Sequence, residues 1–99
     1  MYIYTITGVE ELDDKYGTTG SIRCFGYYSS FDTADIAVKQ NTLDIHEYLY
    51  DYMVIEKVEE GLYPICLDRW FYKWHSGINQ FVPMEEPECL KHIINLGIG

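Results

Sequence analysis

Cysteine and histidine are the first side chains to consider, because together they are the usual ligands of structural zinc. Cys89 and His92 stand three residues apart in a segment with helical periodicity, which places both on one side of a helix. Cys66 and His75 would complete a set of four ligands, but eight residues separate them and no turn brings them together. We therefore expect free thiols, with no metal ligands and no cofactor.

Clustered carboxylates are the next candidates for chemistry. Two groups stand out: Glu10, Glu11, Asp13 and Asp14, and then Glu85, Glu86 and Glu88. General acid and base catalysis needs one desolvated carboxyl group beside an ionised one, and neither cluster has the apolar neighbours that raise a pKa. No glycine-rich elbow or helix-opening cysteine marks an activated Cys-His pair. The sequence predicts a protein that is not an enzyme and has no catalytic residues.

Tyrosine is unusually frequent, with ten among 99 residues. Tyrosine gives a large rigid contact area with a polar tip, and acids beside it suit a surface rich in lysine and arginine. Core packing is the alternative use of the same rings. The predicted partner-binding residues are Glu47, Tyr48, Tyr50, Asp51, Tyr52, Glu59 and Glu60.

A second candidate site lies in the segment RWFYKWH. As a strand it would place Trp70, Tyr72 and Trp74 on one face, with Arg69 and Lys73 on the other. The aromatic face is expected to join the core. The alternative is a small-ligand or nucleotide site in which these rings stack on the ligand and Arg69, Lys73 or Arg23 faces a phosphate.

The net charge limits the classes of partner that the protein is expected to bind. Sixteen acids against seven Lys and Arg give −9 at pH 7. A polyanion gains no counterion-release energy from nucleic acid and is repelled by anionic membranes, so both are disfavoured. A basic protein surface is the partner that such a field attracts, although acidity also simply promotes solubility.

Location and assembly follow from what the sequence lacks. The scattered cysteines favour a reducing compartment. No signal-peptide pattern and no apolar run of membrane-spanning length is seen, so we expect a cytoplasmic monomer or small homo-oligomer.

The elements that must position these residues begin with a strand over 2–7, closed by Gly8, and a solvated loop or wide hairpin over 9–21. A second strand over 22–28 contains Gly26, which suggests a bulge. N-cap residues then precede a short amphipathic helix over 33–41.

The second half begins with an irregular or single-turn connection, followed by a strand over 50–59 that starts centrally and runs out into solvent. A hairpin pairs 69–75 with 80–84, and Pro83 places the returning strand at an edge. A final helix is expected to start at Pro87. Residues 1–99 should form a single α+β domain, with a mainly antiparallel sheet of about five strands, one inserted helix and one C-terminal helix.

At YMVIEKVEEGLYP, RWFYKW, FVPMEEPE and the closing NLGIG, the chain resembles small uncharacterised single-domain proteins of Firmicutes and of their phages and prophages. The matching residues are aromatic and turn residues, spread over roughly 22–99. The resemblance implies a bacterial or mobile-element setting and no particular activity.

Three functions are therefore open. The first is a non-enzymatic interaction protein that binds a basic partner, in its sharpest form an anti-CRISPR-type nucleic-acid mimic that inhibits a host defence nuclease. The second is a ligand-sequestering protein and the third a small enzyme. A contiguous acidic surface would favour the first, a pocket where Trp or Tyr meets Arg the second, and converging His, Cys and carboxylate the third.

Overall fold

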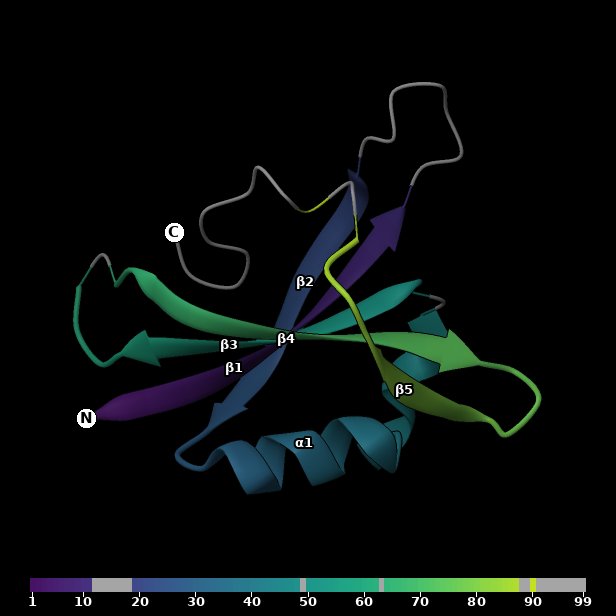
Figure 1. Cartoon of the computed structure of the whole chain (residues 1–99), viewed down its shortest axis with the longest axis horizontal. Helices are drawn as coiled ribbons and strands as arrows, with labels where there is room; N and C mark the ends of the chain where they lie inside the picture. Colours follow the sequence, from purple (N-terminus) through teal and green to yellow (C-terminus); the bar gives the residue numbers. More distant parts are fainter. Residues whose placement is uncertain (12–18, 49, 63, 88–89, 91–99) are drawn as a thin grey trace.

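The computed structural model describes residues 1–11, 19–48, 50–62, 64–87 and 90. Its elements in chain order are β1 (Tyr2–Glu11), β2 (Thr19–Tyr28), α1 (Phe31–Lys39), the 3-10 helix η1 (Thr42–Tyr48), β3 (Tyr52–Glu59), β4 (Cys66–His75) and β5 (Gln80–Met84). The strands form one twisted antiparallel sheet in the order β2-β1-β3-β4-β5 (Figure 1). The expected α+β class is confirmed, whereas most of the expected C-terminal helix lies outside the described residues.

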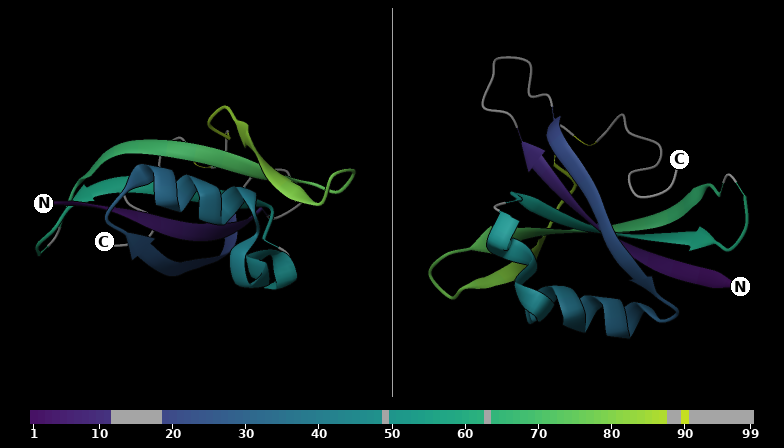
Figure 2. Two further views of the ribbon diagram at one scale, coloured as in Figure 1. Left: turned by 90° about the horizontal axis from the view of Figure 1, so that it is seen from below. Right: turned by 180° about the vertical axis from the view of Figure 1, so that it is seen from behind.

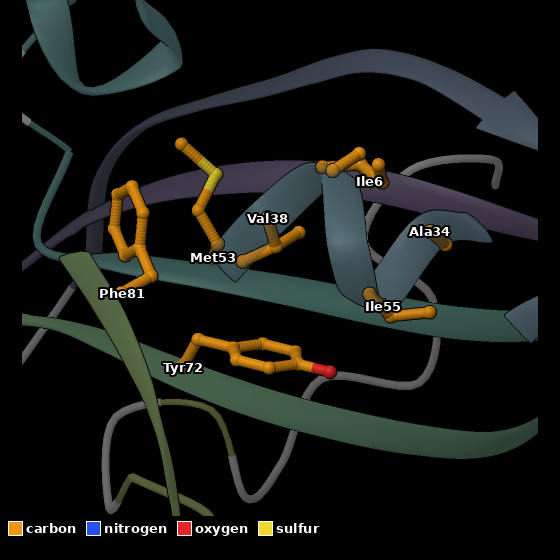
Figure 3. Close-up of a cluster of buried hydrophobic side chains, with 8 residues drawn as sticks. Ile6, Ala34, Val38, Met53, Ile55, Tyr72 and Phe81 are labelled. Carbon is orange, nitrogen blue, oxygen red and sulfur yellow. The ribbon is translucent and has the colours of Figure 1, made fainter. Parts of the chain in front are cut away.

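Helix α1 covers one face of the sheet (Figure 2). Its buried residues are Ala34, Ala37 and Val38, which pack on Met53 and Ile55 of β3. Figure 3 shows the strand side chains of this cluster, Tyr72 and Phe81 among them, projecting toward α1. The tight spacing of small residues on α1 lets the helix lie close to the sheet.

The other face carries a second, smaller cluster. Val9, Tyr52, Val54 and Leu90 are buried there, with Phe71 packed against them. Because β3 contributes to both clusters, it is the centre of the sheet, as its apolar start predicted. The strand does reach solvent at its end, where Glu59 is exposed, but Glu56 in its charged half is 1% exposed, which corrects the expectation there.

Several boundaries also differ from those expected: β3 starts at Tyr52 rather than at 50, β4 starts at Cys66 rather than at 69, and α1 ends at Lys39 rather than at 41. Strand β1 passes Gly8 and buries Val9 completely, and β2 starts at Thr19. Gly8 lies within the strand and serves close packing there: a Cβ at this position would lie 2.8 Å from atoms of the Phe25 and Tyr50 rings, which occupy that space. The helix begins at Phe31, two residues early, since the Phe31 ring packs on Tyr4 and Trp70.

The expected bulge at Gly26, the final hairpin and its edge strand are confirmed. A register shift falls between Ile6 and Thr7 in the pairing with β2, and it creates a bulge beside Gly26, whose φ is +154°. The hairpin pairs Phe71–His75 with Gln80–Met84, and Pro83 lies on the edge strand β5.

Candidate functional site

The predicted partner-binding residues do not form one surface. Asp51 is exposed at the start of β3, whereas Glu59 and Glu60 are exposed beyond its far end. Tyr52 is 6% exposed and belongs to the core, and Tyr50 is half-buried with its ring edge-on to Phe25 at 5.6 Å. Glu47 and Tyr48 lie in η1, and their side chains are not among those described.

The alternative ligand residues are split between the two faces of β4. Trp70, Tyr72 and Trp74 face α1, and the Tyr72 hydroxyl donates a 2.6 Å hydrogen bond to Asp35 Oδ1. The Trp74 ring is covered by the His46 imidazole, stacked at 3.6 Å. Arg69 and Lys73 alternate with these rings, as the strand pattern predicted. The aromatic side chains pack into the core, but Arg69, Trp70 and Tyr72 also line one hollow of about 400 Å³, and Lys73 and Trp74 are not among its residues.

The structure brings a different set together where β3 passes into β4. Leu62, Ile65 and Leu67 are 92%, 69% and 54% exposed. They line two hollows of about 280 and 360 Å³ that share Leu67. The carboxylates of these hollows are Glu59 and Glu60 in one and Asp68 and Glu86 in the other. We call this surface the acidic end: Glu59, Glu60, Leu62, Pro64, Ile65, Leu67, Asp68 and Glu86.

Among the residues that the structure describes, Arg69 and Lys57 are cations near the acidic end, and both contact other side chains. Arg69 Nε lies 3.1 Å from Glu56 Oε2 in a pair that is largely shielded from solvent. Lys57 Nζ lies 4.4 Å from the centre of the Tyr2 ring. The Arg69 charge is balanced by Glu56, and the four carboxylates that line the two hollows outnumber Lys57, so the field there is negative. The N-terminus is tied to the same end, because the Glu60 N–H donates to the Met1 carbonyl at 2.8 Å.

A cysteine also lies beside this surface. The Cys66 thiol donates to the Asp68 carbonyl at 3.2 Å. Burial, and after it the Glu56 carboxylate, raise the pKa of Cys66 to about 11. The group is thus a thiol and not a nucleophilic thiolate at neutral pH. In the described part of the chain, no three His, Cys, Asp or Glu side chains are arranged to hold a metal ion.

Sequence reasoning missed the apolar half of the acidic end. The segment lies between the strand expected over 50–59 and the strand expected over 69–75, and none of its apolar residues was named as a candidate. The available signal was the run EEGLYPICLD, in which apolar residues alternate with Gly, Pro and acids inside a connection. Such a segment lacks the period of a helix or strand that could bury those side chains.

Comparisons with known proteins add no relative: no family model, no curated protein and no solved structure matches this chain. Among the described residues, no helix is both long and apolar enough to span a membrane.

Proposed function

We propose that this protein is a non-enzymatic interaction protein and that its acidic end docks on a basic protein surface. The observation that carries the proposal is the group of three exposed apolar side chains, Leu62, Ile65 and Leu67, flanked by four carboxylates. Contiguous apolar surface with a polar rim is a common property of interaction sites.

The two kinds of side chain would have different tasks in such a complex. Leu62 and Ile65 would supply affinity, because burying an exposed aliphatic side chain is worth about 1.5–3 kcal/mol. Glu59, Glu60 and Asp68 would steer a cationic partner and select it over a neutral one. A partner with Lys and Arg around an apolar spot fits both requirements.

The partner that we infer is a nucleic-acid-binding protein. Channels that hold DNA or RNA combine many Lys and Arg side chains with apolar and aromatic surface. A chain of net charge −9 that occupies such a channel would exclude the nucleic acid. In a phage or mobile-element setting this would inhibit a host defence nuclease.

The test combines capture with competition. The wild type and three variants, Leu62→Asp, Glu60→Lys and Asp32→Lys, are immobilised and used to capture proteins from a bacterial lysate at low and at high salt. Asp32→Lys is the matched control, since Asp32 is an exposed acid of α1 that lines neither hollow of the acidic end. We expect one captured protein that is lost with Leu62→Asp, Glu60→Lys or high salt, is retained by Asp32→Lys, and is displaced by duplex DNA or RNA.

Two results would contradict the proposal. If every captured protein also binds Leu62→Asp and Glu60→Lys, the acidic end is not the interaction site. If the affinity of the partner is the same at both salt concentrations, the carboxylates of the acidic end do not attract it electrostatically.

A further inference from the structure

A separate cleft of about 360 Å³ lies where the edge strand β2 meets α1 and η1. The right panel of Figure 2 shows these three elements together. The floor includes Ile6 and Ala37, and η1 contributes Thr42, Leu43 and Ile45. The β2 wall consists of Arg23, Phe25, Gly26, Tyr27 and Tyr28. No residue of the acidic end lines it, and β1 and β3 separate β2 from β4 in the sheet.

Local geometry explains why the β2 wall has this shape. The bulge beside Gly26 interrupts the regular pairing with β1, and Phe25 packs over Gly8, where any side chain would collide with its ring. The Arg23 guanidinium lies over the Phe25 ring, with its carbon 5.2 Å from the ring centre. The cleft therefore has an aromatic surface with a cation held against it.

The η1 wall contains an unusual leucine. Leu43 has φ +56°, a left-handed conformation that costs free energy for a residue with a bulky side chain. Its side chain is 94% exposed, so no packing within the described residues compensates that cost. A leucine held in this way at the mouth of an apolar cleft gains burial only when something occupies the cleft.

We propose that this cleft binds a small amphipathic anion: an apolar, preferably aromatic, body with one carboxylate or phosphate head. The body would lie against Phe25, Leu43 and Ile45, and the head would reach Arg23. Arg23 is the one charged side chain among the described residues that line the cleft. The volume admits a small molecule of the size that protein pockets commonly hold.

The ligand charge is tested with a matched set of probes. 2-Naphthoate, 2-naphthyl phosphate, 2-naphthol and 2-naphthylmethylammonium share one ring system and differ in their head groups. Each is titrated into the ¹⁵N-labelled protein, and backbone amide shifts are followed by NMR. We expect the two anions to shift amides of β2 and η1 at the lowest concentrations, 2-naphthol to bind more weakly, and the ammonium probe to leave these amides unmoved. The better of the two anions indicates whether the natural head is a carboxylate or a phosphate.

Two variants assign the roles within the cleft. Arg23→Gln should lower the affinity for 2-naphthoate about threefold to tenfold and leave that for 2-naphthol unchanged. Leu43→Ser should lower both affinities. The matched controls are Lys73→Gln, another exposed cation, and Ile78→Ser, another exposed aliphatic residue, and both should bind as the wild type does. All four positions are exposed or nearly so, and circular dichroism checks that each variant folds.

The proposal is wrong if the four probes bind equally, if the shifted amides lie at the acidic end, or if Lys73→Gln has the effect expected of Arg23→Gln. These outcomes are independent of the proposed function, because no residue substituted at the cleft belongs to the docking surface for a basic partner.

Discussion

The two halves of β4 have similar apolar content and opposite environments. In the second half, Tyr72 is 2% exposed beneath α1, and β5 pairs with Phe71–His75. In the first half, Leu67 is 54% exposed and its hollows contain four carboxylates. The difference lies in the neighbouring elements, because α1 packs over Tyr72 and β5 pairs beside the second half of the strand. A single strand can thus stabilise the fold at one end and present an apolar surface at the other.

The largest contrast should come from truncating one side chain in each region. Tyr72→Ala removes a buried ring and should lower the free energy of unfolding by about 3–5 kcal/mol. Leu62→Ala, at the acidic end, should change it by less than about 0.5 kcal/mol. Urea unfolding followed by circular dichroism measures both values. Equal losses would show that the acidic end packs against another part of the chain.

The junction between the two halves depends on the buried pair of Glu56 and Arg69. Arg69→Leu leaves the Glu56 carboxylate without that charge partner at 1% exposure, and we expect a loss of about 3–5 kcal/mol. Lys73→Leu, at an exposed cation on the same face of β4, is the control and should change stability by less than about 0.5 kcal/mol.

A double variant shows whether that loss comes from the buried Glu56 charge or from the lost packing of Arg69. Glu56→Leu with Arg69→Leu removes both charges and should recover much of the stability. If the double variant is no more stable than Arg69→Leu, the contribution of Arg69 comes from packing.

Alkaline pH should lower the stability of the fold through Tyr72, which lies in the covered half. Burial, and then the hydrogen bond and charge of Asp35, raise the pKa of Tyr72 well above its ordinary value of 10.0. The folded protein therefore keeps a proton that the unfolded chain loses near pH 10, so stability must fall as the pH rises above that value. Tyr72→Phe should flatten this fall and cost about 1–2 kcal/mol at neutral pH through the lost hydrogen bond.

This pH dependence is best measured in a Cys66→Ser background. The raised pKa of Cys66 produces a fall of the same sign that begins near its ordinary value of 9.0. An unchanged alkaline slope in Tyr72→Phe would show that the phenol is not the group responsible.

The smallest expected effect is on the labelling rates of two cysteines and not on the stability of the protein. In a Cys89→Ser background, an aromatic disulfide reagent at neutral pH should label the exposed Cys24 about tenfold faster than Cys66, whose pKa of about 11 keeps it protonated. Rates are read from absorbance, and mass spectrometry assigns each site. Equal rates would indicate that Cys66 is more accessible or more acidic than the structure implies.

Regular patterns made much of the fold predictable from the sequence. The alternation in RWFYKWH identified both faces of β4, and Gly26 identified the bulge. The burial of Glu56 was not predictable in this way, because it depends on Arg69, thirteen residues away, lying opposite it in the neighbouring strand. Sequence periodicity describes which face a side chain takes and not which partner meets it there.

The candidate surfaces were less predictable for a related reason. Tyr52 was assigned to the surface from its acidic neighbours, but its place in the central strand buries it. The acidic end depends on where the sheet stops being covered, which follows from the length of β5 and the position of α1. Both are tertiary properties that no local window of residues contains.

The hydrogen bond between the Glu60 N–H and the Met1 carbonyl also determines how this protein should be handled. Any peptide fused ahead of Met1 is tethered next to the acidic end, so it samples that surface at a high effective concentration. A cationic tag placed there would act as an intramolecular competitor for the very partners sought. Protein prepared for binding studies should therefore have a neutral leader, or none, before Met1.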